Sequence, residues 1–212
     1  MHVCYLDFDG VLHYSSVWLK PDQSIEFDTS GRRLFEWEPI LLELLAPHPH
    51  VKIVLSTSWV RVKGLDYAKG RLDLLIRSRV IGATSDSWLP TAEDFALQTR
   101  GMQIWENVQR SALSDWFAID DDGFGLPDWA KDKLVKTKGA FGLSECAVQE
   151  EIRWHLGSLT SLVMIFRRGP NRARSLRQRQ SAPMKRSRGR QHFRLGADWA
   201  LERVMRRFGE LP

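Results

Sequence analysis

Short apolar runs alternate with stretches of helical period along the first 160 residues. The brief apolar runs predict strands at residues 3–6, 51–55, 79–84, 116–119 and 133–137. Apolar side chains that recur every three to four positions predict helices at residues 33–45, 64–76, 100–112 and 145–156. Because strands and helices alternate, we expect an α/β fold with a central, mainly parallel sheet that is covered on both faces.

The same pattern makes two finer predictions. Residues 17–19 and 24–28 are expected to form the arms of a short hairpin, with Pro21 and Asp22 between them as turn residues. The helix predicted at 64–76 has one apolar face, and the side chains expected to point inward from it are Leu65, Ala68, Leu72 and Leu75.

Asp7 and Asp9 directly follow the first predicted strand, and Gly10 comes next. Residues i and i+2 of an extended chain point the same way, so both carboxylates are expected on one side of the strand's end. Two like charges this close raise each other's pKa unless a cation or protons offset them. The competing interpretation is a simple turn, because Asp and Gly favour turns.

Polar side chains also follow two later strands of the predicted sheet. Ser56 and Thr57 come after the second strand, and Asp120 and Asp121 come after the fourth. In a parallel sheet the ligand crevice lies beyond the carboxyl ends of the strands, so these side chains are expected to converge there with Asp7. The alternatives are a helix N-cap for the two hydroxyls and an acidic, solvated turn for the two carboxylates.

The hexapeptide at residues 7–12, Asp-Phe-Asp-Gly-Val-Leu, resembles motif I of the haloacid dehalogenase (HAD) superfamily, whose members mostly transfer phosphoryl groups. Ser56, at the end of an apolar strand, resembles motif II, and the paired acids at 120–121 resemble motif IV. Motif III is a Lys or Arg at the start of the helix before motif IV. Arg100 fits it by position, and Arg61 is the competitor.

Four other segments are similar to a small HAD domain found attached to bacterial Swiss Army Knife RNA-repair proteins. They are Ser-Thr-Ser-Trp at 56–59, Arg-Val-Ile-Gly-Ala-Thr at 79–84, Arg-Gly at 100–101 and Gly-Leu-Ser at 142–144. The resemblance covers roughly residues 1–160 and implies a HAD-like, Rossmann-like three-layer sandwich. Neither usual cap position holds a large insertion, so we expect no large cap domain and an open site.

The resemblance also implies roles for individual residues. Asp7 is the expected nucleophile and Asp9 the general acid and base, and the catalytic set is completed by Ser56 and Arg100. The implied phosphate-binding residues are Gly10, Ser56, Thr57 and Arg100. The implied Mg²⁺ ligands are Asp7, Asp9, Asp120 and Asp121. The implied activity is Mg²⁺-dependent hydrolysis of phosphomonoesters through an aspartyl-phosphate. An open site and a basic C-terminal tail make nucleic-acid ends the expected phosphorylated substrates, with nucleotides or other small phosphomonoesters as the alternatives.

The positive net charge of the chain is concentrated after residue 166. Residues 167–212 carry 14 Lys and Arg against 3 Asp and Glu, whereas the preceding residues carry 17 basic and 23 acidic side chains. We therefore divide the chain into a HAD-like phosphatase domain at 1–160, a basic linker at 161–195 that is expected to be disordered, and a C-terminal amphipathic helix at 196–212.

This basic segment suggests a second activity. Residues 167–194 are expected to contact nucleic acid by neutralising phosphates, while a solvated segment is the simpler interpretation. The alternative function is accordingly a nucleic-acid-binding or partner-recruiting protein with a catalytically weak HAD domain.

Three further features of the sequence bear on where in the cell the protein is expected. The two cysteines, Cys4 and Cys146, have neither a disulfide framework nor metal-ligand spacing. No apolar run approaches the roughly 18 residues that a membrane-spanning helix needs. The N-terminus enters a strand directly and shows no signal segment, so no membrane contact and a cytoplasmic location are expected.

Overall fold

The computed structural model describes residues 1–15, 17–20, 25–27, 30–85 and 97–167. Its centre is a parallel five-stranded sheet in the order β5-β4-β1-β6-β7. The strands of this sheet are β1 (His2–Leu6), β4 (Val51–Leu55), β5 (Val80–Ala83), β6 (Asp115–Asp120) and β7 (Leu134–Lys136). A separate antiparallel pair is formed by β2 (Val17–Leu19) and β3 (Ile25–Phe27).

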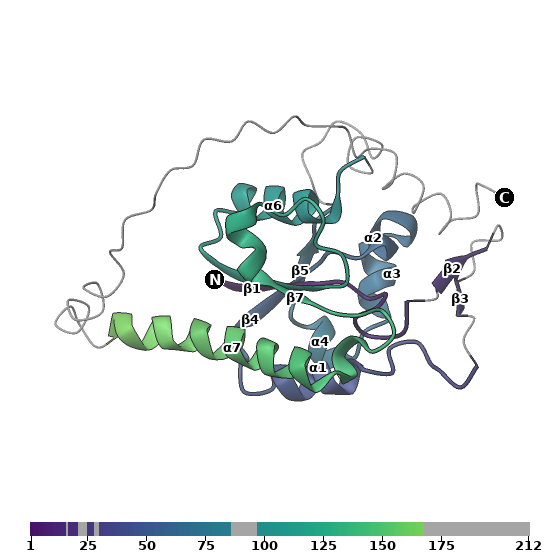
Figure 1. Cartoon of the computed structure of the whole chain (residues 1–212), viewed down its shortest axis with the longest axis horizontal. Coiled ribbons are helices and arrows are strands. Elements are labelled where there is room, and N and C mark those ends of the chain that lie inside the picture. Colours follow the sequence, from purple (N-terminus) through teal and green to yellow (C-terminus); the bar gives the residue numbers. More distant parts are fainter. Residues whose placement is uncertain (16, 21–24, 28–29, 86–96, 168–212) are drawn as a thin grey trace.

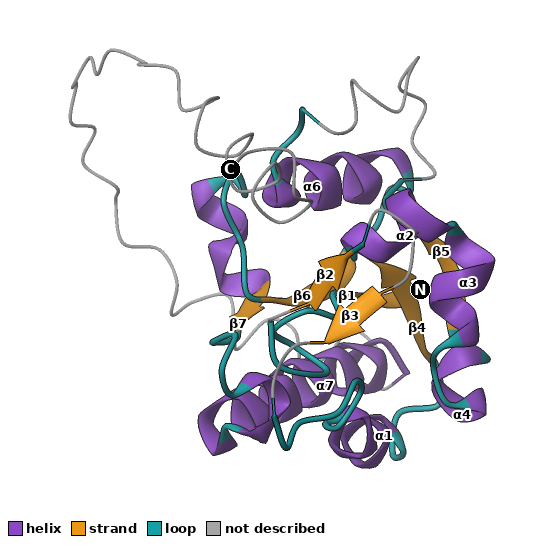
Figure 2. Ribbon diagram, turned by 90° about the vertical axis from the view of Figure 1, so that its right-hand side faces the viewer, coloured by secondary structure: helices purple, strands orange, loops and turns teal. Residues whose placement is uncertain are grey.

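Helices cover both faces of the sheet and make the three-layer α/β sandwich that the sequence predicts (Figures 1 and 2). The α-helices are α1 (Glu38–Leu45), α2 (Ser58–Lys63), α3 (Leu65–Gly70), α4 (Leu74–Arg77), α6 (Arg100–Arg110) and α7 (Cys146–Arg167). Two 3-10 helices are η1 (Asp128–Lys133) and η2 (Gly142–Ser144). In Figure 2, α6 lies on one side of the sheet, and α1 and α7 lie on the other.

The central strand β1 is buried on both faces from Val3 to Leu6, which explains the apolar run over these residues. Val3 and Tyr5 belong to a cluster that includes Ile104 of α6. Cys4 and Leu6 point to the opposite cluster, which contains apolar residues of α1 and α7. Successive residues of a strand face opposite sides, so this one short strand supports both layers of the core.

The two predicted hairpin arms pair as expected, whereas the predicted turn residues Pro21 and Asp22 lie outside the described part of the chain. β2 and β3 pair in antiparallel fashion, with Val17 opposite Phe27. The first helix begins later than expected. The helix predicted from residue 33 begins only at Glu38. Phe35 has φ of 60°, which a right-handed helix cannot contain, and a proline occupies the first turn of α1, where its missing N–H is tolerated.

The stretch predicted as one helix at 64–76 is divided into α3 and α4. Asp73 caps the new helix by accepting a hydrogen bond from the N–H of Leu75 at 2.8 Å. This break shifts the helical phase, so the prediction that Leu75 points inward is wrong. Leu75 is 67% exposed, and Ile76 is fully buried in its place.

The last helix is longer than the sequence pattern suggested. α7 continues to Arg167, beyond the end predicted near residue 156, and its later turns extend past the amino end of the sheet (Figure 1). Residues 168–212 lie outside the described part of the chain. The three-part domain division therefore stays a prediction beyond α7.

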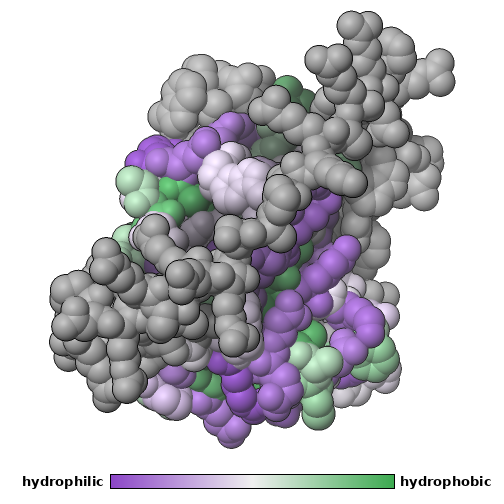
Figure 3. Space-filling model, turned by 60° about the vertical axis from the view of Figure 1, so that its left-hand side comes forward, coloured by the Kyte–Doolittle hydropathy of each residue, from purple (hydrophilic) through white to green (hydrophobic). Residues whose placement is uncertain are grey.

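Among the described residues visible in Figure 3, most of the surface is hydrophilic, and the apolar side chains gather in small patches. Among the described residues, no helix combines the length and the apolar character needed to span a bilayer. The described residues also include no large cap over the carboxyl ends of the strands, where the β2–β3 hairpin lies (Figures 1 and 2).

Gly101, in the first turn of α6, lets the loop after β6 pack closely against this helix. Its N–H donates a hydrogen bond to the carbonyl oxygen of Phe124 at 2.9 Å. A Cβ at this position would lie 2.1 Å from the nitrogen of Leu126 and 2.8 Å from the Phe124 oxygen. Backbone atoms cannot move aside as a flexible side chain can, so only glycine fits here.

Gly101→Ala is therefore expected to destabilise the fold, by about 1–3 kcal/mol, although alanine is usually the better helix former. The measurement is the free energy of unfolding in urea. Gly157→Ala is the matched control, since Gly157 is also helical but a Cβ there would meet no atom within 4 Å. It should be neutral or stabilising by about 0.5–1 kcal/mol. Equal effects of the two changes would contradict the close-packing explanation.

Candidate active site

The strand register brings Asp7, Ser56 and Asp120 to one level at the carboxyl edge of the sheet. Leu6 of β1 pairs with Leu55 of β4 and with Ile119 of β6, so the residues that follow these three are aligned. The N–H of Asp7 donates to the Ile119 carbonyl at 3.1 Å, and the N–H of Ser56 donates to the Leu6 carbonyl at 2.9 Å. The hydrogen bonds between the strands thus continue one residue beyond them and fix the backbone at Asp7 and Ser56.

Asp7, Asp120 and Asp121 form the acidic centre of this edge. Each offers one carboxylate oxygen, and the three oxygens lie within 4.8 Å of one another. Asp7 and Asp120 are buried, and Asp121 is half-buried. Burial, followed by the neighbouring charge of Asp7, raises the pKa of Asp120 well above its usual range, while Arg100 acts in the opposite direction.

Arg100, the first residue of α6, supplies positive charge to this acidic centre. Its Nε lies 3.4 Å from Oδ2 of Asp120, and one Nη lies 4.0 Å from Oδ1 of Asp7. Burial alone would lower the pKa of the Arg100 guanidinium, but the charges of Asp7 and Asp120 outweigh it and raise this pKa. Arg61 in α2 differs, because burial and the charge of Arg100 lower its pKa.

The two hydroxyl residues after β4 have different roles. The Ser56 hydroxyl donates to Oδ2 of Asp120 at 3.5 Å and is fully buried at the acidic centre. Thr57 is the N-cap of α2, and its side-chain oxygen accepts a hydrogen bond from the N–H of Trp59 at 3.3 Å. The capping alternative raised by the sequence therefore applies to Thr57, while Ser56 faces the carboxylates.

Gly10 allows the loop after β1 to lie against the loop after β6. It has φ of 73°, and a Cβ there would lie 2.7 Å from a carboxylate oxygen of Asp121 and 3.1 Å from Cα of Gly139. The hydroxyl of Thr137, just after β7, donates to the Gly10 carbonyl at 2.7 Å. These contacts connect the first loop of the chain to the last strand of the sheet.

Asp9 lies close in sequence to Asp7, but its carboxylate is outside the group of three. Its Oδ1 accepts a hydrogen bond from the indole N–H of Trp59 at 3.1 Å and lies 3.1 Å from Nε2 of His13. All three side chains are buried. The side chains of Asp7 and Asp9 thus occupy different surroundings, and metal binding by Asp9 stays a prediction.

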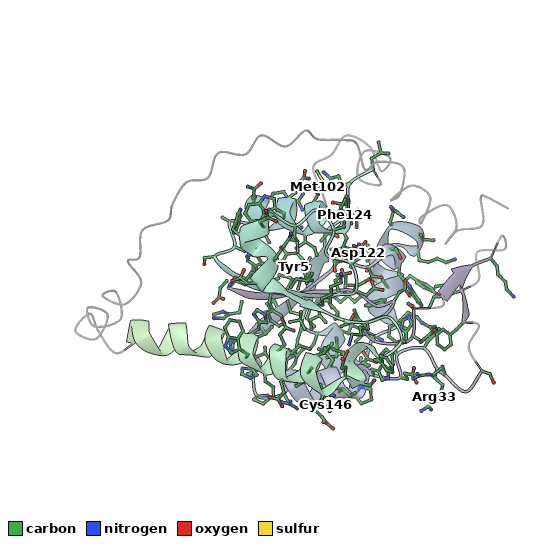
Figure 4. All side chains as sticks on the ribbon, in the orientation of Figure 1. Tyr5, Arg33, Met102, Asp122, Phe124 and Cys146 are labelled. Atoms are coloured by element: carbon green, nitrogen blue, oxygen red, sulfur yellow. The ribbon has the colours of Figure 1, made fainter. Side chains whose placement is uncertain are left out.

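Asp122 completes the turn after β6. Its N–H donates to Oδ1 of Asp120 at 2.9 Å, and its own carboxylate accepts from the N–H of Phe124 at 3.0 Å. Figure 4 shows Asp122 and Phe124 near the start of α6. The third acid of the Asp-Asp-Asp run therefore orders the loop that presents the other two.

Sequence reasoning did not identify His13, Trp59 and Thr137 as site residues. His13 lies four positions after Asp9, and Trp59 is part of the Ser-Thr-Ser-Trp segment, so both were adjacent to recognised motifs. Thr137 is the last residue of a predicted strand, at the same carboxyl end at which Ser56 follows the second strand, and that position was the available signal for it.

The acidic centre has the donor chemistry of a divalent-cation site. Mg²⁺ prefers hard oxygen ligands and commonly uses one or two carboxylates with several waters. The three oxygens from Asp7, Asp120 and Asp121 fit this requirement, and the absence of a Cβ at Gly10 leaves room for Asp121 to approach.

Comparison with known families agrees with this arrangement. The family model described as the HAD domain in Swiss Army Knife RNA repair proteins matches residues 3–148. No curated protein and no solved structure matches the chain. The match covers more than half of the chain and includes β1 to β7, the acidic centre and Arg100, and its family places the chain in the general class of phosphatase-type hydrolases. The chain belongs to the family of HAD domains found in Swiss Army Knife RNA repair proteins.

Proposed function

We propose that this protein is a Mg²⁺-dependent phosphomonoester hydrolase that works through an aspartyl-phosphate on Asp7. The observation that carries the proposal is the grouping of Asp7, Asp120 and Asp121 within 4.8 Å, beside the Arg100 guanidinium. Three carboxylates and one guanidinium at a buried sheet edge suit a site that receives both a cation and a phosphate.

In the first step, a carboxylate oxygen of Asp7 attacks phosphorus as the bond from phosphorus to the leaving oxygen breaks. The leaving oxygen keeps that electron pair and takes a proton from Asp9. In the second step, Asp9 accepts a proton from water, which attacks the phosphoryl group and releases Asp7 and inorganic phosphate. Arg100 and the Ser56 hydroxyl hold the phosphoryl oxygens during both steps.

Mg²⁺ would be held by side-chain oxygens of Asp7, Asp120 and Asp121, with the backbone carbonyl of Asp9 as the fourth proposed ligand. When bound, the cation would offset the repulsion between the Asp7 carboxylate and the incoming phosphate. Arg100 remains at the edge of the same group and provides a second, permanent positive charge.

Asp7→Asn is expected to abolish hydrolysis of p-nitrophenyl phosphate in the presence of Mg²⁺, with a loss on the order of 10³-fold or more, because the amide is no nucleophile. The wild-type protein should also lose activity when the metal is removed by a chelator. Asp128→Asn makes the same chemical change at an exposed acid and is the matched control. Retained activity in Asp7→Asn would rule out the aspartyl-phosphate route.

Arg100→Ala is expected to lower kcat/KM for the same substrate by about 100-fold, because it removes the guanidinium beside Asp7 and Asp120. Arg61→Ala should have the smaller effect, since Arg100 is the residue that fits motif III by position and contacts both acids. Arg100→Lys keeps the charge without the planar fork and should fall between wild type and Arg100→Ala. A larger loss in Arg61→Ala than in Arg100→Ala would mean that Arg61, and not Arg100, is the motif III cation.

Nucleic-acid ends or nucleotides are the proposed substrates. The described residues include no large cap over the site, and an open site of this kind would suit a bulky phosphorylated molecule. The 14 basic residues at 167–212 would attract a polyanion. The family to which the chain belongs is described by its occurrence in RNA repair proteins, and this supports the same substrate class.

The charge of this segment also favours nucleic-acid binding as a second candidate function. A chain ending at residue 167 is expected to bind single-stranded RNA or DNA more weakly than the full chain, and with a smaller salt dependence. Fluorescence anisotropy at several salt concentrations measures both. As a control for chain length, a full-length variant carries glutamine in place of Arg172, Arg174, Arg177 and Arg179, so that positive charge is removed without shortening the chain. If truncation leaves binding and its salt slope unchanged, residues 168–212 have no role in contacting nucleic acid.

A further inference from the structure

His13 and Trp59 meet on the same oxygen of Asp9. The indole N–H of Trp59 and Nε2 of His13 both lie 3.1 Å from Oδ1. His13 is fully buried, and Trp59 and Asp9 are almost fully buried, so solvent does not compete for these contacts. An indole N–H can only donate, which makes Oδ1 an acceptor in this arrangement.

The hydrogen-bond partners of the two ring nitrogens of His13 indicate its tautomer. Within the described part of the chain, Nδ1 of His13 is buried and has no hydrogen-bond partner. If the proton were on Nδ1, a buried N–H would be left unsatisfied, which is costlier than a bare ring nitrogen. His13 therefore carries its proton on Nε2 and donates it to Oδ1 of Asp9. Two donors on one oxygen then restrict rotation of the Asp9 carboxyl.

Aromatic rings hold these two donors in place. The centroid of the His13 ring lies 5.0 Å from that of Phe35 and 5.9 Å from that of Trp59. The centroids of Phe35 and Trp59 are 5.6 Å apart. The Phe8 ring packs edge-on against Phe35 and Trp59, with centroid distances of 5.2 Å and 5.7 Å. Phe35 has a positive φ, an unfavourable conformation for a bulky side chain that persists only where packing enforces it.

We propose that His13 and Trp59 are positioning residues for Asp9 in the reaction. By holding Oδ1, they turn the other oxygen, Oδ2, toward the leaving oxygen, to which it passes a proton as the bond to phosphorus breaks. This inference rests on the proposed function, because it assigns how the acid of that reaction is oriented. It predicts that loss of either donor impairs proton transfer to the leaving group without weakening phosphate binding.

The test compares two substrates whose leaving groups differ in their need for a proton. Glycerol 2-phosphate releases an alkoxide that must be protonated, whereas 2,4-dinitrophenyl phosphate releases a stable phenolate. In full-length protein with Mg²⁺, His13→Leu and Trp59→Phe should each lower kcat/KM for glycerol 2-phosphate by about 10-fold or more. For 2,4-dinitrophenyl phosphate kcat/KM should be unchanged, because it reports only the first step and not the later attack of water, which Asp9 also assists. For glycerol 2-phosphate the loss should appear in kcat and not in KM.

Three further variants separate positioning from folding. Asp9→Asn should show the same dependence on leaving group, with a larger loss. His13→Gln places an amide donor near the position of Nε2. It should therefore keep most of the wild-type ratio of kcat/KM for glycerol 2-phosphate to kcat/KM for 2,4-dinitrophenyl phosphate. Trp116→Phe makes the same change as Trp59→Phe at a buried tryptophan on the other face of the sheet, and it should leave the ratio unchanged. Thermal unfolding monitors the fold of each variant.

The outcomes distinguish this proposal from the one on which it rests. If His13→Leu and Trp59→Phe reduce kcat/KM for both substrates equally, or reduce it for neither, the positioning role is wrong while the phosphatase assignment stands. If the wild-type protein hydrolyses neither substrate, the proposed function fails, and this inference fails with it. Should His13→Leu not fold, Trp59→Phe and His13→Gln still give the substrate ratio that decides the question.

Discussion

The mutual repulsion of three carboxylates is the constraint on which the rest of the site depends. Asp7, Asp120 and Asp121 bring their oxygens within 4.8 Å of one another, and two of these residues are buried. Two unit charges about 4 Å apart interact by roughly 4 kcal/mol at an effective dielectric constant of 20, a large share of the roughly 5–15 kcal/mol that stabilises a typical domain. Burial raises the pKa of Asp120, and the repulsion from its neighbouring carboxylates raises this pKa further. Arg100 offsets part of it, and a divalent cation is the natural complement for the rest.

The fold holds these charges by backbone contacts. The ladder that joins β1 to β4 and β6 places Asp7 and Asp120 at the same level. Close approaches at Gly10 and Gly101 then join the loops that follow β1 and β6 to each other and to α6. A carboxylate cluster held in this way cannot relax by moving apart, so its repulsion is available to favour a bound cation.

Two acids separated by a single residue acquire different chemistry from their surroundings. Asp7 lies among charges, within reach of Arg100 and the acids after β6. Asp9 lies among aromatic rings and donors, with Trp59 and His13 on its Oδ1. Environments that differ this sharply suit the proposed roles of Asp7 as nucleophile and Asp9 as proton donor and acceptor.

The sequence by itself determined the α/β class, the strand positions and the acids that follow them. These features depend on local properties, namely apolar runs, helical period and residue type, and the ordered motifs identified the family as well. The apolar period alone did not show that Ile76 and not Leu75 is buried, because an N-cap at Asp73 breaks the helix and shifts its phase. Only the tertiary structure placed Arg100 against Asp7 and Asp120, and His13 and Trp59 against Asp9. These contacts depend on how the residues after β1, β4 and β6 and the first turn of α6 pack together, and no local pattern records distances between segments so far apart in the chain.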